Sequence, residues 1–220
     1  MVLSQAVEDY IKTIYTLELE SEGEGVSTTK IAEVLEVSSA SVTNMIKKLA
    51  KMGLVRYESY YGATLTDSGK KIALEIIRHH RLLELYLKEV MGYSWDEVHD
   101  EAEKLEHHIS ERFEDKIAEL LNHPTHDPHG DPIPSKEGIM PEIATEPLTD
   151  ADVGEQLMLG RVTNQEPELL RYLETKGLIP GIELEVIEKA PFKGPVTVKV
   201  DGEEQVIGYE VAVNLYMMKG

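Results

Sequence analysis

The residues from Val98 to Ile109 bring carboxylate and imidazole side chains together at helical spacing. Ser94 and Glu97 before them have the spacing of a capping box, which predicts a helix that begins at Ser94. At about 100° per residue, one apolar stripe of this helix contains Val98, Ala102, Leu105, Ile109 and Phe113. Four metal-binding side chains follow the border of that stripe, namely His99, Glu103, Glu106 and His107. Such side chains together bind divalent cations, although the pattern alone fits a solvated charged face equally well.

Two other stretches carry side chains of the same types. His80 and Glu84 are four residues apart, at the border of the apolar face of a helix expected from Thr66 to about residue 90. Residues 122–134 contain four prolines and a glycine, which exclude a helix there. This segment holds His123, His126, Asp127 and His129. It is interpreted either as a flexible linker or as a source of further ligands.

The composition limits the kind of protein. The chain has 220 residues, enough for two or three small domains, and a formal net charge of -19. It contains no cysteine, which excludes disulfides, a thiolate zinc site and cysteine catalysis. The first residues lack the basic start and the apolar run of a signal peptide. No stretch approaches the roughly 18 apolar residues of a membrane span. We therefore expect a cytoplasmic protein with no membrane partner.

The charge is unevenly distributed along the chain. Between Ser38 and Lys71, six basic side chains stand against two acidic ones, a local balance of +4 (6 − 2). The basic residues are Lys47, Lys48, Lys51, Arg56, Lys70 and Lys71, and the acidic ones are Glu58 and Asp67. A locally basic segment in a very acidic chain indicates an anionic partner for one face.

The order of elements up to residue 66 is that of a winged helix-turn-helix. We expect a helix over residues 4–19, a short helix capped by Ser27, and a third helix capped by Ser38 or Ser39 and ended by Gly53. Two short strands follow over residues 54–66. The third helix would enter the major groove of DNA. The alternative is a winged helix that is used for protein contacts.

The expected DNA contacts follow from this arrangement. Small and polar residues at the start of the third helix suit base edges, and lysines on its later turns suit phosphates. The base-edge residues are Ser38, Ser39, Ala40, Ser41, Thr43 and Asn44, the phosphate residues are Lys47, Lys48 and Lys51, and the wing residues are Arg56 and Tyr60.

Two further parts are expected after the winged helix. The helix over residues 66–90 and the next helix have longer apolar faces than one small domain needs, which predicts a dimer interface. A small SH3-like barrel is expected from alternating strands over residues 158–162, 182–187, 196–200, 205–207 and 211–216, with a short helix over 167–177. The fold class is thus mainly α with a small β domain. The expected domains are residues 1–70 (winged helix), 71–146 (dimerisation and metal binding) and 147–220 (barrel).

These motifs together resemble one known family. Residues 80–84, 98–102, 106–107, 127–134 and 177–181, in this order of elements, resemble the diphtheria toxin repressor and manganese transport regulator family. The resemblance covers essentially the whole chain. It implies a dimeric repressor that binds operator DNA when it is loaded with Mn²⁺ or Fe²⁺, and it identifies the barrel as similar to the FeoA-type third domain of the longer members.

The resemblance also implies a set of metal ligands. One site of the family is matched by Asp9, His80, Glu103, Glu106 and His107. A second site is matched by Glu84, Asp127 and His129, although relatives with this site have cysteine at the position of Asp127. His99 matches a ligand of the iron-responsive branch. A barrel ligand is also implied, with Glu166 nearest by a gap-free match and Asn164 and Glu168 as competitors. Lys12 stands where two-domain manganese regulators have a glutamate, so their binuclear site is not assumed.

The donor types favour manganese. Iron-responsive members have methionine and cysteine at the positions of Asp9 and Glu103, whereas oxygen and nitrogen donors alone suit Mn²⁺. The expected function is a Mn²⁺-dependent repressor, with an Fe²⁺-dependent regulator as the alternative. A metallohydrolase is a distant alternative, because no separate general base or substrate pocket is evident. A module that uses metal only for folding is a further alternative.

Overall fold

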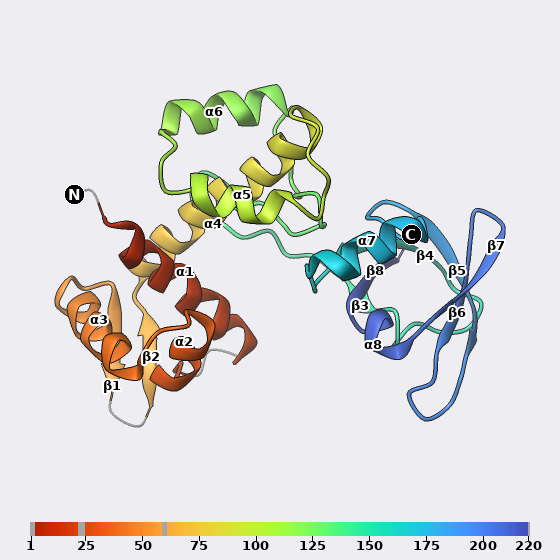
Figure 1. Ribbon diagram of the computed structural model, residues 1–220, viewed down its shortest axis with the longest axis horizontal. Coiled ribbons are helices and arrows are strands. Elements are labelled where there is room, and N and C mark those ends of the chain that lie inside the picture. Colours follow the sequence, from red (N-terminus) through yellow and green to blue (C-terminus); the bar gives the residue numbers. More distant parts are fainter. Residues whose placement is uncertain (1–2, 22–24, 59–60, 220) are drawn as a thin grey trace. The chain divides into compact units, whose positions relative to one another are not determined.

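The computed structural model describes residues 3–21, 25–58 and 61–219 (Figure 1). These residues form two compact units, and the division runs within one long helix, between His79 and His80. The first unit covers residues 1–79, 106–109 and 134–140, and the second covers residues 80–105, 110–133 and 141–220. Both units therefore contain metal ligands that the sequence predicts.

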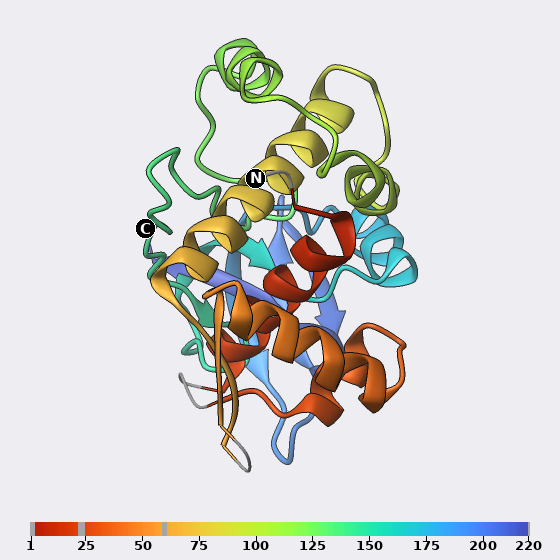
Figure 2. The same cartoon turned by 90° about the vertical axis from the view of Figure 1, so that its left-hand side faces the viewer.

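The first unit begins with the expected winged helix-turn-helix. Three helices, α1 (Gln5–Glu20), α2 (Thr28–Val34) and α3 (Ser39–Lys51), precede a hairpin of β1 (Val55–Glu58) and β2 (Gly62–Leu65). The hydroxyls of Ser27 and Ser38 accept hydrogen bonds from backbone N–H groups of the first turns of α2 and α3, so both helices start where their capping residues predict. The antiparallel hairpin packs beside α3 in both views (Figures 1 and 2).

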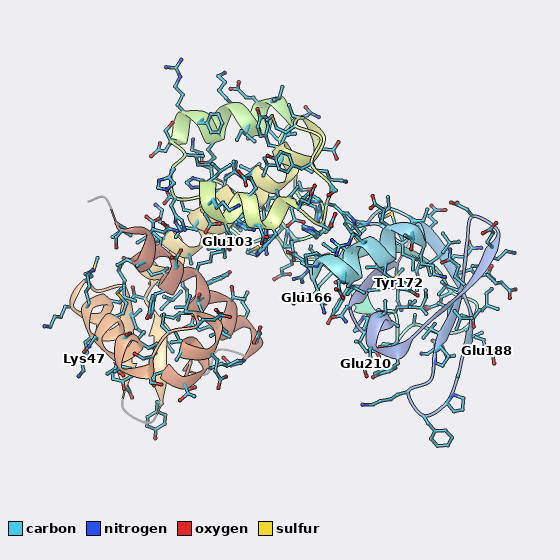
Figure 3. The ribbon with its side chains drawn as sticks, viewed as in Figure 1. Lys47, Glu103, Glu166, Tyr172, Glu188 and Glu210 are labelled. Atoms are coloured by element: carbon cyan, nitrogen blue, oxygen red, sulfur yellow. The ribbon has the colours of Figure 1, made fainter. Side chains whose placement is uncertain are left out.

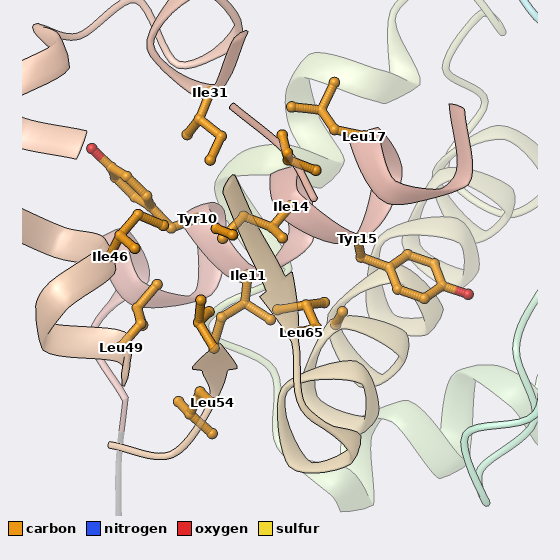
Figure 4. Packing of buried hydrophobic residues seen from close by; sticks show 14 of the residues in the cluster. Tyr10, Ile11, Ile14, Tyr15, Leu17, Ile31, Ile46, Leu49, Leu54 and Leu65 are labelled. Atoms are coloured by element: carbon orange, nitrogen blue, oxygen red, sulfur yellow. The ribbon is translucent and has the colours of Figure 1, made fainter. Parts of the chain in front are cut away.

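The core of this unit joins α1 to α3 and the hairpin (Figure 4). Ile11 and Ile14 of α1 are fully buried in one cluster with Ile46 and Leu49 of α3. Because the buried residues of α1 recur every three or four positions, the border of this face is left for polar side chains such as Asp9. The position of Asp9 is therefore fixed by the same core that fixes α3.

Three helices follow the hairpin. The first confirms the long helix expected over residues 66–90, whereas the second begins and ends at other residues than expected. Helix α4 spans Asp67–Glu89, α5 spans Val98–Leu105 and α6 spans Glu111–Leu120. The expected helix start at Ser94 is wrong, because residues 95–97 form a turn and α5 begins only at Val98. The expected capping contact does exist, since Ser94 Oγ donates to Glu97 Oε2 at 2.7 Å. Trp95 in this turn is buried in the core of the barrel, so long-range packing outweighs the local capping signal.

The end of α5 also differs from the expected helix. Helix α5 ends at Leu105, so Glu106 and His107 lie on the turn that follows it. The expected apolar stripe therefore does not continue to Ile109 and Phe113, and a new helix, α6, begins after the capping residue Ser110. Two of the four metal-binding side chains of this stretch are thus placed by a turn rather than by a helix.

The barrel of the second unit is one antiparallel sheet of six strands in the order β3-β8-β4-β5-β6-β7. The strands are β3 (Glu146–Pro147), β4 (Gln156–Val162), β5 (Glu183–Lys189), β6 (Val196–Val200), β7 (Glu203–Ile207) and β8 (Leu215–Lys219). Helix α7 (Pro167–Thr175) follows β4, as the sequence predicts. The expected strand over residues 211–216 is wrong, because α8 (Tyr209–Ala212) occupies its first part and β8 begins only at Leu215.

The observed architecture confirms the expected fold class. The winged helix, the helical segments and the small antiparallel barrel follow each other in the expected order. No helix in the described residues is both long enough and apolar enough to cross a membrane.

Candidate metal centres and nucleic-acid interface

Asp9, Glu106 and His107 form a group in the first unit that we call the first cluster. Asp9 comes from α1, whereas Glu106 and His107 come from the turn after α5. His107 Nε2 lies 2.8 Å from Asp9 Oδ1 and 3.3 Å from Glu106 Oε1. The side chains of Glu106 and His107 are buried, and that of Asp9 is 34% exposed. The first cluster therefore joins the winged helix to this turn through side chains that can bind a divalent cation.

Two further charged side chains contact the first cluster. Lys12 Nζ donates to both carboxylate oxygens of Glu106, at 2.9 and 2.8 Å. On the other side, His107 Nδ1 donates to Glu8 Oε2 at 2.7 Å, which leaves His107 Nε2 for a cation. A carboxylate behind a ligand histidine fixes the tautomer and the orientation of its ring. The first cluster thus has one internal cation, Lys12, and one orienting anion, Glu8.

The first cluster borders a cavity of about 630 Å³. Glu8, Glu106 and His107 line this cavity together with apolar side chains from the start of the chain, the end of α3 and α4. His79 also lines it and is a packed histidine, as expected, with its Nδ1 3.2 Å from the backbone oxygen of Glu106. Two of the three residues of the first cluster, Glu106 and His107, therefore line this cavity.

His80, His99 and Glu103 form the middle cluster, which belongs to the second unit. His80 Nε2 and His99 Nδ1 are 3.2 Å apart, and they lie 2.9 and 3.2 Å from Glu84 Oε1. His80 Nδ1 is 4.0 Å from Glu103 Oε1. The side chains of His99 and Glu103 are 46% and 43% exposed, and Figure 3 shows Glu103 on α5. The middle cluster therefore lies at the surface of its unit.

Glu84, Asp127 and His129 form the loop cluster, in which all three residues are buried. Glu84 Oε2 lies 3.8 Å from His129 Nδ1. Asp127 Oδ1 accepts hydrogen bonds from the backbone N–H groups of His129 (2.8 Å) and Asp131 (2.9 Å). His129 Nε2 donates to the backbone oxygen of Trp95 at 2.9 Å, so Nδ1 is the ring nitrogen that faces Glu84. The loop cluster thus shares Glu84 with the histidines of the middle cluster.

Burial and neighbouring charges shift the pKa values of the loop cluster. Burial raises the pKa of Asp127 well above its usual range, and the carboxylates of Asp131 and Glu84 raise it further. Burial also opposes the ionisation of Glu84, but the charge of His80 and contacts with the neighbouring histidines hold the pKa of Glu84 well below its usual range. For His129, burial lowers the pKa, and the carboxylate of Glu84 outweighs this effect and raises it. The loop cluster therefore holds protons that a cation would displace.

The donor chemistry of the loop cluster fits a divalent cation. Asp127 Oδ2 and His129 Nδ1 are buried and have no hydrogen-bond partner among the described residues. A buried polar atom without a partner costs about 1–3 kcal/mol, and a cation would satisfy both atoms. The three clusters offer carboxylate oxygens and imidazole nitrogens, and the chain has no cysteine. Such donors accept Mn²⁺ and Fe²⁺ as well as Zn²⁺.

The structure groups the expected ligands in three sets. Asp9, Glu106 and His107 are brought together, and so are Glu84, Asp127 and His129. The expected five-residue site also includes His80 and Glu103, which belong to the other unit, so that site stays a prediction. Glu166 is exposed at the start of α7 (Figure 3) and lies outside the three clusters found among the described residues. Its role as a barrel ligand also stays a prediction.

The expected DNA contacts lie on the exposed side of α3 and on the hairpin. Val42, Ile46 and Leu49 bury the opposite face of α3 in the core. Lys47 points outward from the helix (Figure 3). Ser38, Ser39, Ala40, Ser41, Asn44, Lys47, Lys48, Lys51 and Arg56 are exposed, and Thr43 is half-buried. Tyr60 lies outside the described residues.

Sequence reasoning missed several residues around the clusters. Glu8 directly precedes Asp9 in the sequence, and Asp131 stands in the same motif as Asp127, so nearby signals existed for both. Trp95 also has a signal, because it is the single tryptophan of the chain. The residues without a local signal are Arg161, whose Nε is 2.5 Å from Asp131 Oδ1, and Gln165, whose Nε2 donates to Asp131 Oδ2 at 2.8 Å.

Comparison with known families finds three matches along the chain. Residues 2–63 match "Iron dependent repressor, N-terminal DNA binding domain" and residues 66–135 match "Iron dependent repressor, metal binding and dimerisation domain". Residues 146–218 match "FeoA domain". Together these matches extend over most of the chain.

Individual relatives and solved structures agree with these matches. The iron-dependent repressor IdeR of Mycobacterium tuberculosis is 33% identical over 216 residues, which cover 93% of this chain and 92% of that protein. The regulator MntR of Oceanobacillus iheyensis is 42% identical over 118 residues, which cover 54% of this chain and 78% of that protein. A solved manganese-dependent transcriptional repressor in complex with manganese has a TM-score of 0.85 at 36% identity, with 97% of this chain and 100% of that chain covered. ScaR with bound Cd²⁺ has a TM-score of 0.79 at 34% identity, with 97% and 99% covered.

Proposed function

The chain belongs to the family of metal-dependent transcriptional repressors, and from this premise we propose that it binds operator DNA as a homodimer when it holds Mn²⁺. The relatives named above are repressors and regulators rather than enzymes, so the metallohydrolase alternative is dropped. We also propose that the domains are residues 1–70, 71–146 and 147–220. The barrel is of the FeoA type.

The first cluster is the observation that supports this function most directly. Asp9 lies on α1 of the winged helix, and its ligand partners Glu106 and His107 lie on the turn after α5. Asp9, Glu106 and His107 would hold one cation, which would supply the positive charge that lets two carboxylates face each other closely. The cation would add to the contacts that Lys12 and Glu8 of α1 already make with this turn, and would hold α1 to it more firmly. Because α1 and α3 share one core, α3 is fixed as well.

Control of α3 explains how a cation can govern DNA binding. A symmetric dimer presents its two α3 helices to half-sites about one or more helical turns of DNA apart. A shift of a few ångströms spoils this register, so the affinity for operator DNA depends on how firmly α1 and α3 are held. The chain as a whole is very acidic, with a formal net charge of -19, so DNA binding depends on the exposed lysines of α3.

The donor set supports Mn²⁺ as the effector. Asp9, Glu103 and Glu106 provide oxygen, and the remaining ligands of the first and middle clusters are histidines. Oxygen and nitrogen donors without sulfur suit a hard ion of high coordination number. Fe²⁺ is the alternative effector, because the family includes iron-dependent repressors as well as manganese-dependent ones.

Operator binding titrated with metals tests the proposed function. The operator would first be selected from random duplexes with the metal-loaded protein, and binding would then be followed by fluorescence anisotropy with Mn²⁺, Fe²⁺ under anaerobic conditions, and Zn²⁺. We expect the apo protein to stay folded and to bind weakly, and Mn²⁺ to restore tight binding. Tight binding without metal would contradict the proposal. Loss of folding without metal would support a metal that serves the fold alone.

Two variants on α3 test the proposed DNA-binding face. Asn44→Ala should remove a base-edge contact, cost about 1–3 kcal/mol and relax specificity at one position of the operator. Lys47→Ala should weaken binding to all sequences alike and lower the slope of affinity against salt by about 1. Equal effects of both variants on operator and random DNA would show that another face of the unit enters the groove.

A further inference from the structure

The segment that carries Asp127 and His129 is bound to strand β4 of the barrel. The backbone oxygen of His129 accepts a hydrogen bond from the backbone N–H of Val162, at 2.8 Å. Gly130 has a φ of +86°, and a Cβ at this position would lie 1.9 Å from the backbone oxygen of Gly160. Only glycine allows this approach. The ligand-bearing loop, residues 127–131, is therefore pressed against the backbone of β4.

Asp131 at the end of this loop receives two side chains from the barrel. Arg161 Nε lies 2.5 Å from Asp131 Oδ1, and Gln165 Nε2 donates to Asp131 Oδ2 at 2.8 Å. Arg81 of α4 lies farther away, with 3.7 Å between its Nη2 and Asp131 Oδ1. Asp131 is buried, with 5% of its surface exposed. Its carboxylate is thus engaged mainly from the barrel side.

The same residue is connected to the ligands of the loop cluster. The backbone N–H of Asp131 donates to Asp127 Oδ1 at 2.9 Å, and that of His129 donates to the same oxygen at 2.8 Å. These two bonds occupy Oδ1 and leave Asp127 Oδ2 and His129 Nδ1 without hydrogen-bond partners among the described residues. Any displacement of Asp131 would therefore turn the Asp127 carboxylate relative to Glu84.

We propose that Arg161 and Gln165 are positioning residues for the loop cluster, because they hold Asp131 and through it aim Asp127 and His129 at Glu84. The barrel is then part of the metal centre without having to supply a ligand. Since binding energies are reciprocal, a cation in the loop cluster also strengthens the attachment of β4 to the loop. This inference rests on the proposed function in one respect, namely that the loop cluster binds a divalent cation.

The experiment uses the full-length protein and compares a barrel arginine that contacts the loop, Arg161, with one that does not, Arg171. Arg161→Leu and Gln165→Leu remove the contacts with Asp131. Arg171→Leu is the matched control, because Arg171 pairs with Asp96 in the turn before α5 (2.6 Å) and, among the described residues, makes no hydrogen bond or ion pair with residues 127–131. Mn²⁺ and Cd²⁺ binding would be measured by calorimetry, with Asp127→Ala and Asp9→Ala used to assign the binding steps to the loop cluster and the first cluster.

Trp95 provides a second, local signal. It is the single tryptophan, and its ring is stacked on His129 with 5.9 Å between ring centroids and 22° between planes. Its fluorescence should change when Mn²⁺ or Cd²⁺ occupies the loop cluster. A change in this signal that tracks the step lost in Asp127→Ala would report the geometry of His129 independently of operator binding.

We expect Arg161→Leu to weaken the step of the loop cluster by about 10–100-fold, as for other residues that orient metal ligands, and Gln165→Leu to weaken it less. The step of the first cluster should be unchanged in both, and Arg171→Leu should leave both steps unchanged. Arg161→Lys, which keeps the charge, should recover part of the affinity and covers the case in which Arg161→Leu fails to fold.

Two results would overturn the inference, and they differ from failure of the proposed function. If Arg161→Leu and Arg171→Leu weaken the step equally, or if Arg161→Leu lowers only the melting temperature, Arg161 has an attachment role alone. If the wild-type protein shows no binding step that Asp127→Ala removes, the loop cluster does not bind a cation, and the premise itself fails.

Discussion

The first cluster and the loop cluster use the same kinds of ligands in opposite surroundings. In the first cluster, Lys12 already pairs with Glu106, Glu8 already accepts a hydrogen bond from His107, and both Glu106 and His107 line a cavity. In the loop cluster, Asp127 Oδ2 and His129 Nδ1 are buried without a hydrogen-bond partner among the described residues, as is His107 Nε2 of the first cluster. Within the same part of the chain, no lysine pairs with the loop cluster as Lys12 does with Glu106, although Arg81 Nε lies 3.8 Å from Asp127 Oδ2. A cation must therefore displace the ion pair of Lys12 in the first cluster, whereas in the loop cluster it must displace protons.

This difference suggests a division of roles between the two clusters. A site in which the metal competes with internal charges responds over a range of metal concentrations, because the metal-free form is itself stable. A site with buried, unsatisfied donors gains more from the cation and remains filled at lower concentrations. If both clusters bind a cation as proposed, we expect the first cluster to act as the sensor and the loop cluster to hold a resident cation.

The strongest test of this comparison removes one carboxylate from each cluster. Asp9→Ala should abolish the metal dependence of operator binding while the protein remains a folded dimer, because it removes the α1 ligand from the first cluster. Lys12 and Glu8 of α1 would keep their contacts with Glu106 and His107, so the loss would be specific to the metal. Asp127→Ala should leave the midpoint of the Mn²⁺ response of operator binding close to that of the wild type, because the first cluster keeps all three of its residues. Operator binding by fluorescence anisotropy, with size-exclusion chromatography as the control for the dimer, measures both. A wild-type response of Asp9→Ala would disprove the link through α1.

The second test changes the donors that support manganese. Replacing Asp9 by methionine and Glu103 by cysteine removes two anionic oxygen donors and introduces softer sulfur, which favours Fe²⁺ over Mn²⁺. We expect the double variant to need much more Mn²⁺ for operator binding, roughly 100-fold if each lost ligand costs about tenfold. It should still respond to Fe²⁺ under anaerobic conditions. An unchanged ratio of Mn²⁺ to Fe²⁺ activation would remove the main support for manganese.

The residues that define this comparison were predictable from the sequence to very different degrees. The helices of the winged helix could be located because their signals are local, such as the capping hydroxyls of Ser27 and Ser38. The helix start at Ser94 and the strand over residues 211–216 were wrong. At Ser94 a local signal was present, but Trp95 next to it is buried in the barrel, which no local pattern reveals.

The sites show the same limit. The ligand types and the motif around Asp127 are visible in the sequence, and the structure brings these residues together. Lys12 and Arg161 contact their partners across 94 and 30 residues of chain, and such contacts depend on packing rather than on spacing. Sequence reasoning therefore identified the side chains that offer donors, but not the side chains that set how those donors behave.

Lys12 allows a test of the competition assumed for the first cluster. Lys12→Met should destabilise the metal-free protein by about 2 kcal/mol, because the buried Glu106 loses its cationic partner. Mn²⁺ should restore most of this loss, so the rise in melting temperature on addition of metal should be larger than in the wild type. Lys30→Met is the control, because its ion pair with Glu20 is exposed and involves no residue of the three clusters. A smaller gain from Mn²⁺ in Lys12→Met would mean that Lys12 assists metal binding.

The smallest expected effect concerns pH and the loop cluster. Burial raises the pKa of Asp127, and the neighbouring carboxylates of Asp131 and Glu84 raise it further. For His129, burial lowers the pKa, but the carboxylate of Glu84 outweighs this effect, so the pKa is raised. Both groups therefore hold protons to a higher pH in the metal-free fold. The stability they contribute to that fold is present at low pH and is lost as pH rises through their raised pKa values. A cation binds Asp127 and His129 only after both have lost these protons. Its affinity should therefore fall on acidification, by about tenfold per pH unit for each proton displaced.

Calorimetry in buffers of different ionisation enthalpy counts the protons that Mn²⁺ releases from the loop cluster. Asp127→Asn keeps an oxygen that accepts the backbone hydrogen bonds of His129 and Asp131 but has no proton to lose. Its Mn²⁺ affinity should be lower and should depend less on pH than that of the wild type. The step that Asp9→Ala removes should keep its wild-type pH dependence in Asp127→Asn, since the two clusters belong to different units. If Asp127→Asn releases as many protons as the wild type, Asp127 binds Mn²⁺ without losing a proton. The difference between the first cluster and the loop cluster would then rest on the ion pair of Lys12 alone.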